Sequence, residues 1–495
     1  MLFNSLHFLV FFPVVVLVFL IAPRKLRSVW LLAASYYFYM SWNPKYALLI
    51  AFSTVSTYLT GLLLNKVSEN AEEQNKSTYK KLCVAGSFLI NLGILFFFKY
   101  FDFALENVNR VLSVLNVTVL EKPFDVLLPV GISFYTFQAL GYTVDVYRGD
   151  IKAEKNLINY ALFVSFFPQL VAGPIERSEN LLIQIQTIEK KKLWNRNRIR
   201  DGLILMLWGF FQKLMIADRA AIAVNAVYNQ YQAFGGGEII LATLLFAFQI
   251  YCDFDAYTNI ARGAARVCGF ELMANFRQPY FATSIADFWR RWHVSLSSWF
   301  RDYLYIPLGG SRVGAVRNWM NLMITFLVSG AWHGASWHFI LWGGLHGVYQ
   351  VVGKWKNYLL KRIQAAFGMK KELHLPKILQ MAVTFCLAVF AWMLFRVNSL
   401  GDLKGMLSIM VKEPYVKDLA AMNMSNVEWV LLCISLLVLF TVDFLQEKKV
   451  SLNRLVVKRT AVVRVLLYTM GIGSIIIFGV YGVAYDASQF LYFQF

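Results

Sequence analysis

Charged residues are scarce in this sequence of 495 residues, since Asp, Glu, Lys and Arg make up only 16% of it. Soluble domains carry roughly 25%. No polar stretch is long enough to fold as a separate soluble domain, so a single membrane-embedded domain is expected over residues 1–495. Apolar stretches of about 20 residues recur from end to end. The sequence therefore predicts an all-α polytopic membrane protein with roughly 11–13 membrane segments, some of them re-entrant.

Several signatures of familiar chemistry are also missing. The five cysteines form no CxxC pair and show no zinc-site spacing, so they are interpreted as core residues. The sequence contains no GxSxG, HExxH or GxxxxGK[ST] pattern. Serine hydrolysis, zinc peptidase activity and nucleotide hydrolysis are therefore unsupported.

Positive charge is in excess, with a formal net charge of +19. It is spread over loops rather than gathered in a soluble basic module, which argues against a nucleic-acid partner. The first apolar run, Leu6–Ala22, is followed by the basic cluster Arg24–Arg27, which predicts an uncleaved helix with its N-terminus outside. Basic flanks on both sides of the short apolar segment Leu157–Val171 predict that it is re-entrant and that protein or water meets its backbone groups.

The stretch Ser329–Gly334 places His333 inside the apolar run Trp319–Val352, which is long enough to cross a bilayer. Burial favours the neutral imidazole, which can act as a general base. The alternative is a packed histidine bonded to a neighbouring helix. On a single helix His338 is rotated about 140° from His333, and His346 about 80° from His338, so no metal site is expected and both are interpreted as structural.

A second stretch, Asp287–Gly310, mixes arginine with aromatic residues. Its aromatic and leucine residues recur at spacings of 3 and 4, which predicts one helix face made of Trp289, Trp292, Leu296, Trp299 and Tyr303. His293 lies beside that face. Arg290 and Arg291 are candidates for binding an anionic ligand. The alternative is an interfacial amphipathic helix.

Two carboxylates, Asp253 and Asp255, follow a predicted span. They are consistent with a proton or cation path. They are equally consistent with pairing to Arg262 or Arg266.

Taken together, these stretches resemble the membrane-bound O-acyltransferase family, closest to its bacterial alginate O-acetylation branch. The motifs that carry the resemblance are, in order, Pro129–Gln138, Phe166–Ile175, Tyr251–Phe254, Asn275–Tyr280, Phe288–Gly310 and Gly330–Gly334. The family's fold is a ring of tilted helices around a central tunnel. The resemblance implies that His333 is the catalytic histidine and that His293 occupies the second polar position. Asn275, Asp287 and Trp332, which lie in or beside these motifs, join Arg290 and Arg291 as substrate-binding candidates.

The resemblance further implies transfer of an acetyl group across a bacterial cytoplasmic membrane. Acetyl-CoA is the expected donor, with no permanently bound cofactor, and an exported polysaccharide is the expected acceptor. The expected partner is a separate extracytoplasmic acetyltransferase. D-alanyl transfer to a cell-wall polymer and a transporter or flippase of an acylated carrier remain the alternatives.

The last residues, 484–495, form an aromatic tail that ends Phe490–Phe495. It resembles a short motif of a membrane peptide from teichoic-acid D-alanylation, whose tyrosine is proposed to carry the acyl group. This makes Tyr492 a candidate acyl relay. The alternative is an aromatic tail at the membrane interface.

Overall fold

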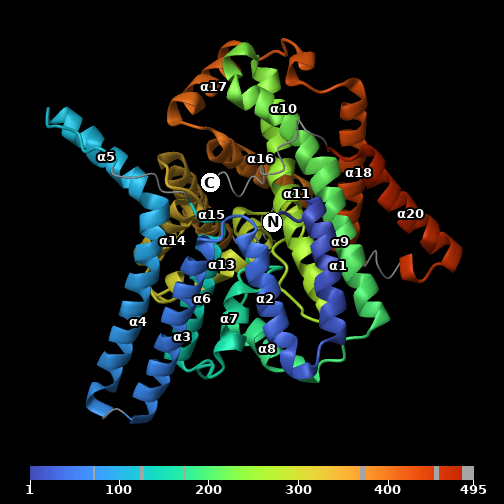
Figure 1. The fold of residues 1–495 in the computed structure, drawn as a ribbon. Coiled ribbons are helices and arrows are strands. Elements are labelled where there is room, and N and C mark those ends of the chain that lie inside the picture. Colours follow the sequence, from blue (N-terminus) through green and yellow to red (C-terminus); the bar gives the residue numbers. More distant parts are fainter. Residues whose placement is uncertain (71–72, 123–127, 172, 368–374, 451–455, 482–495) are drawn as a thin grey trace. The chain divides into compact units, whose positions relative to one another are not determined.

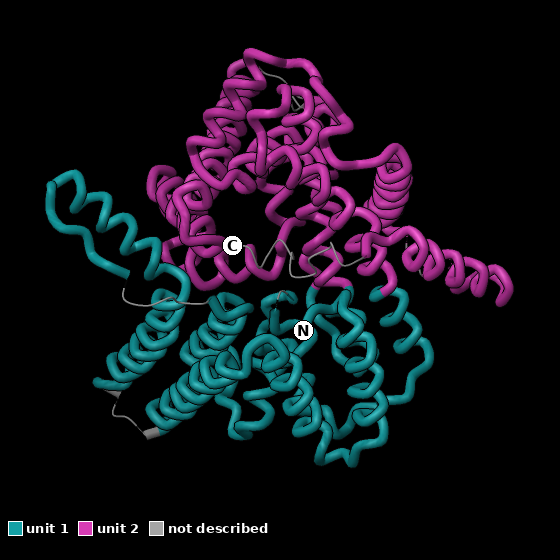
Figure 2. Tube along the Cα trace, turned by 45° about the horizontal axis from the view of Figure 1, so that its top comes forward, with its two compact units in different colours: residues 1–206, 260–273 teal, residues 207–259, 274–495 magenta. Residues whose placement is uncertain are grey.

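The computed structural model describes residues 1–70, 73–122, 128–171, 173–367, 375–450 and 456–481 (Figure 1). All regular structure in these ranges is helical. The chain divides into two compact units, residues 1–206 with 260–273 and residues 207–259 with 274–495 (Figure 2). Whether both belong to a single folding domain stays a prediction. Tyr492 and the aromatic tail lie outside the described residues.

Unit 1 contains the first eight α-helices and the ends of two helices that continue into unit 2. Its elements are α1 (Leu6–Ile21), η1 (Arg24–Leu26), α2 (Arg27–Met40), α3 (Tyr46–Asn70), α4 (Glu73–Leu95), η2 (Phe96–Tyr100), α5 (Phe101–Val114), α6 (Ile132–Arg148), α7 (Leu157–Ser165), η3 (Ser178–Leu182), α8 (Ile183–Gln186), η4 (Ile188–Lys190), the start of α9 (Arg196–Phe211) and the end of α11 (Gly236–Cys268).

Unit 2 holds the rest of α9 and α11 together with the C-terminal helices. Its other elements are η5 (Gln212–Ala217), α10 (Asp218–Asn229), η6 (Tyr231–Ala233), η7 (Pro279–Phe281), α12 (Ile285–Arg291), α13 (Val294–Phe300), η8 (Arg301–Tyr305), α14 (Ala315–His333), α15 (Trp337–Ala366), α16 (Lys377–Arg396), α17 (Leu400–Lys412), η9 (Leu419–Met422), α18 (Asn426–Glu447) and α20 (Ala461–Phe478).

Six helical stretches in the described residues are long and apolar enough to cross a membrane. They are Tyr46–Glu69, Asn75–Val114, Gly236–Cys268, Lys377–Arg396, Asn426–Glu447 and Ala461–Phe478. The shorter apolar helix α1 adds to them. These helices establish the expected all-α polytopic architecture. Other predicted segments are broken into shorter helices, as the next two paragraphs describe.

The predicted re-entrant segment forms α7, a helix of only nine residues whose chain then turns. Its freed backbone groups meet protein, as expected. The carbonyl of Phe163 accepts hydrogen bonds from the side-chain amides of Gln138 at 2.6 Å and Gln169 at 3.0 Å. Both amides are buried. Buried side chains therefore satisfy the Phe163 carbonyl near the end of this short helix.

The apolar run Trp319–Val352 is not a single helix, because α14 ends at His333 and α15 begins at Trp337. The two helices pack back to back through glycines. A Cβ atom on Gly330 would lie 2.3 Å from the carbonyl oxygen of Phe339, and one on Gly343 would lie 2.2 Å from that of Phe326. Such an approach is open only to glycine. The Gly330 contact therefore fixes the last turn of α14, which carries His333.

The interpretation of all five cysteines as core residues is wrong in part. Cys252 and Cys268 are buried, Cys83 is half-buried, and Cys386 and Cys433 are exposed. The exposed pair lies on α16 and α18, two of the apolar membrane-length helices. An apolar cysteine on such a helix is compatible with lipid as its surroundings.

Candidate functional site

His333 is the last residue of α14 and is 8% exposed. Its imidazole meets the indole of Trp342 at a centroid distance of 5.0 Å and the ring of Phe395 at 5.5 Å, both nearly edge to face. These rings come from α15 and α16. The side chain that the sequence singled out therefore sits in an aromatic enclosure built by three helices of unit 2.

His293 stands between α12 and α13, with a backbone φ of +43° in the left-handed region. Its side chain is 1% exposed and packs edge to face on Phe254 at 4.6 Å. Burial lowers the pKa of His293 to about 3, because a charged imidazole cannot be solvated there. His293 is therefore a neutral imidazole at physiological pH.

The predicted single helix through Trp289 and Tyr303 is wrong. It is interrupted at Trp292 and His293, and a π-helical turn, η8, follows α13. Residues outside the helix cause the interruption: Arg277 donates its backbone N–H to the carbonyl of Arg291, and the Val294 N–H donates to the carbonyl of Asn275. This tertiary pairing overrides the local helical pattern.

Asn275 holds the turn that carries His293. Its side chain is fully buried, and its Oδ1 accepts hydrogen bonds from the Oγ of Ser295 at 2.6 Å and from the Ser295 backbone N–H at 3.4 Å. Its Nδ2 donates to Thr258 at 3.1 Å. His293 makes no side-chain cap to α13, so Asn275 supplies the capping acceptor from another segment.

Trp332 connects the two histidines. Its indole lies 5.0 Å from the ring of His333 and 6.1 Å from that of His293, and its own exposure is 3%. Four of the predicted site residues, His293, His333, Trp332 and Asn275, are thus brought to one buried region of unit 2.

The predicted anion-binding residues have a different setting. Arg290 is exposed. Arg291 forms ion pairs with Asp287 at 3.1 Å and with Glu447 at 2.7 Å. Two carboxylates therefore neutralise Arg291, and Asp287 is committed to it. The assignment of Arg290, Arg291 and Asp287 to a substrate stays a prediction.

A buried ionic cluster in unit 2 was missed as such by sequence reasoning. The Nζ of Lys213 lies 2.8 Å from Asp218 and 2.6 Å from Asp253, and all three side chains are at most 5% exposed. Next to Asp253 in sequence, Asp255 accepts from the amides of Gln212 at 2.8 Å and Asn259 at 2.9 Å. The available signal was a lone lysine in the apolar run Gly202–Ile216.

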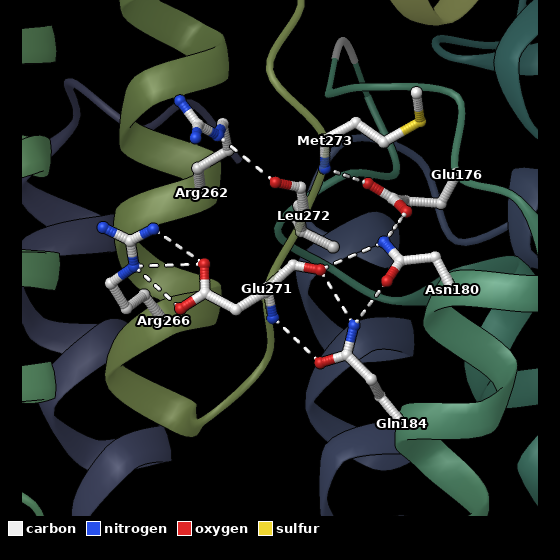
Figure 3. A network of polar contacts seen from close by, with 8 residues as sticks. All are labelled: Glu176, Asn180, Gln184, Arg262, Arg266, Glu271, Leu272 and Met273. Atoms are coloured by element: carbon white, nitrogen blue, oxygen red, sulfur yellow. Dashed lines mark hydrogen bonds and ion pairs between the residues drawn. The ribbon is translucent and has the colours of Figure 1, made fainter. Parts of the chain in front are cut away.

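The suggestion that Asp253 or Asp255 pairs with Arg266 is wrong, because Arg266 binds Glu271, and the suggested pairing with Arg262 stays a prediction. In unit 1, Arg262 donates to the carbonyl of Leu272 at 3.3 Å, and Arg266 binds Glu271 at 2.7 Å (Figure 3). The arginines hold the segment that follows α11, and the aspartates hold Lys213 and its neighbours.

The same network contains a buried carboxyl group. Glu176 accepts hydrogen bonds from the Met273 N–H at 2.5 Å and from Asn180 at 2.6 Å (Figure 3). Burial raises the pKa of Glu176 to about 7, although these bonds and the charge of Arg262 oppose the shift. Glu176 therefore titrates near neutral pH.

The other two histidines of the apolar run have packing roles. His346 is fully buried, and its Nδ1 accepts a hydrogen bond from Trp289 at 3.2 Å. His338 is buried beside Phe339. Within the part of the chain that the structure describes, no three His, Cys, Asp or Glu side chains are grouped to hold a metal ion.

Membrane-length helices and a buried pair of histidines on one indole define a multi-pass membrane protein with a candidate catalytic centre in its apolar interior. Residues 152–399 match the model of the membrane-bound O-acyltransferase family, MBOAT, and the chain belongs to that family. The matched range contains every predicted site residue except Tyr492.

The relatives include enzymes named for acetyl transfer and enzymes named for D-alanyl transfer. The chain is 36% identical to the probable alginate O-acetylase AlgI of Pseudomonas syringae pv. tomato, over 81% of this chain and 73% of the relative. It is 34% identical to the peptidoglycan O-acetyltransferase of Helicobacter pylori, over 83% and 80%. It is 28% identical to the teichoic acid D-alanyltransferase of Streptococcus thermophilus, over 55% of this chain and 69% of the relative. The chain is an O-acyltransferase.

Proposed function

We propose that this enzyme transfers an acetyl group from cytoplasmic acetyl-CoA through the bacterial cytoplasmic membrane, for O-acetylation of an extracytoplasmic polysaccharide. The observation that carries the proposal is the buried His333, joined to His293 through Trp332. Greater identity to acetylating relatives than to the D-alanyl group supports acetyl as the acyl group.

In this proposal the neutral imidazole of His333 accepts the proton of the acceptor hydroxyl as its oxygen attacks the thioester carbonyl. The new C–O bond forms, the C–S bond breaks, and the proton on His333 passes to the leaving thiolate. No acyl-histidine is needed. The aromatic enclosure of His333 excludes water that would otherwise hydrolyse the thioester.

His293 has a supporting role in the same step. The ring of His293 contacts the indole of Trp332, which also contacts His333. Because His293 is neutral at physiological pH, its N–H can donate a hydrogen bond without bringing a charge into the apolar interior. Arg290, at the exposed end of α12, is the candidate that remains for the phosphates of the donor.

The acceptor side involves further proposed components. A polysaccharide is the final acceptor, and a separate extracytoplasmic acetyltransferase receives the acetyl group before it. Tyr492 is the proposed relay between them and His333. These assignments rest on the family resemblance.

The test uses the purified full-length chain in lipid nanodiscs with acetyl-labelled acetyl-CoA. Release of free CoA and transfer of label to an added polysaccharide or partner are expected. His333→Gln should lose both by at least about a hundredfold. His7→Gln, at an exposed histidine of unit 1, is the matched control and should keep both.

Three results would contradict the proposal. One is full activity in His333→Gln. Another is label taken up only from a D-alanyl-loaded carrier protein, which identifies the D-alanyl reaction. The third is transport of label without release of CoA, which identifies carriage of an acylated molecule.

A further inference from the structure

Two basic turns of unit 1 that are far apart in sequence lie against each other. The guanidinium of Arg27, which is 9% exposed, donates from Nη1 to the carbonyls of Ile188 at 3.3 Å, Glu189 at 3.4 Å and Lys191 at 3.3 Å. Consequently η1 packs on η4, and both turns lie at the end of unit 1 where α2 approaches α8 (Figure 1). Because they are in contact, the two turns face the same side of the membrane.

Arginine also fixes the rest of the second turn. Arg198 donates to the carbonyl of Lys192 at 2.9 Å and to that of Leu193. Lys191 points inward, where its Nζ donates to the carbonyl of Gly269 at 2.6 Å and lies 4.0 Å from the centre of the Phe270 ring. Five carbonyls of residues 188–193 are therefore held by two buried or half-buried guanidinium groups.

The fixed backbone makes the side chains alternate. Lys191 and Leu193 face the protein, whereas Lys190, Lys192 and Trp194 are exposed. Trp194 is 70% exposed. The hydrogen bonds that fix the preceding backbone keep its side chain at the surface. On η1, beside this segment, Arg24, Lys25 and Leu26 are also exposed. We name this surface the basic rim: Arg24, Lys25, Leu26, Lys190, Lys192, Trp194 and Arg196.

The chemistry of the basic rim identifies its partner. It carries five cationic side chains, and Glu189 is the single carboxylate within its two segments. Tryptophan and leucine stand among these cations. An indole prefers the boundary between hydrocarbon and headgroups, and clustered lysine and arginine next to membrane helices attract anionic lipids. An acidic protein surface would satisfy the charges but would not account for an exposed Trp194 at the end of a membrane unit.

We propose that the basic rim binds the anionic headgroups of one membrane leaflet, with Trp194 seated among them. The rim is built rather than incidental, because Arg27 joins its two halves across more than 160 residues of sequence. The proposal is independent of the acyl group and of the acceptor.

The experiment places the full chain in nanodiscs of phosphatidylcholine with or without phosphatidylglycerol. Trp194 fluorescence is taken as the difference between the wild type and Trp194→Phe, and it is quenched with brominated lipid of either class. Quenching by brominated phosphatidylglycerol is expected to exceed that by brominated phosphatidylcholine at equal mole fraction. The excess should shrink as salt rises.

Removing cations from the basic rim, or from elsewhere on the protein, distinguishes binding by the rim from a general effect of the net charge. The triple variant Lys190→Gln, Lys192→Gln, Arg196→Gln should lower the affinity for phosphatidylglycerol, measured by native mass spectrometry, by at least about tenfold. The matched control Lys45→Gln, Lys404→Gln, Lys412→Gln removes three other exposed cations and should leave that affinity unchanged.

Two outcomes would overturn the proposal. In the first, both brominated lipids quench Trp194 equally, or the control variant loses as much affinity as the rim variant. In the second, brominated phosphatidylcholine quenches Trp194, added polyglutamate reduces this quenching, and unbrominated phosphatidylglycerol in the nanodisc does not reduce it. The rim would then be a docking surface for protein.

Discussion

The side-chain oxygen of Asn275 accepts a 2.6 Å hydrogen bond from the hydroxyl of Ser295, two residues beyond His293. The two partners are 20 positions apart in the sequence, and the bond closes the chain between them into a loop. The placement of His293 therefore depends on the side chain of Asn275, which acts on it through Ser295.

Asn275→Ala should displace His293 and leave the polar groups of Ser295 and Thr258 without their partner. We expect a loss of about 1–3 kcal/mol of stability and a fall in kcat, with the KM for the acyl donor unchanged. Asn275→Asp keeps the acceptor for Ser295 and should recover part of kcat. Equal kcat values for the two variants would contradict a positioning role.

Gly330→Ala should damage the site through packing. The added Cβ would meet a backbone oxygen at 2.3 Å, so α14 and α15 must separate, at a cost of roughly 1–3 kcal/mol. Gly353→Ala is the matched control, because nothing lies within 4 Å of its Cβ position and alanine favours a helix. Thermal unfolding and acyl transfer should fall in the first variant and hold in the second.

Lys213→Met should be strongly destabilising, by about 3–5 kcal/mol, because Asp218 and Asp253 would remain buried without their cation. Adding Asp218→Asn and Asp253→Asn should restore part of the loss, since no uncompensated charge remains. Lys122→Gln, at the exposed pair with Asp102, should change the unfolding temperature little. No recovery in the triple variant would show that the cluster acts through more than charge balance.

The stability of unit 1 should depend on pH through Glu176. Its pKa is raised from 4.5 to about 7, so the folded state binds the proton more tightly than the unfolded state. Stability from this group is complete below about pH 4.5 and is lost as pH rises through 7. The apparent unfolding temperature should fall between pH 5.5 and 8, and Glu176→Gln should flatten that dependence. If the unfolding temperature of Glu176→Gln falls with pH as steeply as that of the wild type, another group causes the pH dependence.

Tyr492→Phe keeps the aromatic ring of the tail and removes only the hydroxyl. If Tyr492 relays the acyl group, acetylation of the extracytoplasmic acceptor should be abolished while the protein still inserts normally. Phe490→Tyr in the same tail is the matched control and should be active. Normal acetylation in Tyr492→Phe would leave the tail with an interfacial role.

Apolar runs were sufficient to predict the long helices, because a run such as Val427–Leu445 must be helical in lipid. They also located His333. The break at His293 was not predictable from spacing, since backbone hydrogen bonds from Val294 to Asn275 and from Arg277 to Arg291 cause it. The ion pair between Arg291 and Glu447 joins residues 156 positions apart, which no local pattern reveals. Lys213 could have been flagged, because a lone lysine in an apolar run requires a partner.

The segment after α11 has a consequence for synthesis. Met273 donates to Glu176 within unit 1, yet residues 207–259, which belong to unit 2, are made between them. A growing chain therefore cannot complete its first unit before α10 and most of α11 have been made. During that interval the carboxyl of Glu176 lacks one of its donors. Throughout that interval neither His293 nor His333 has been made.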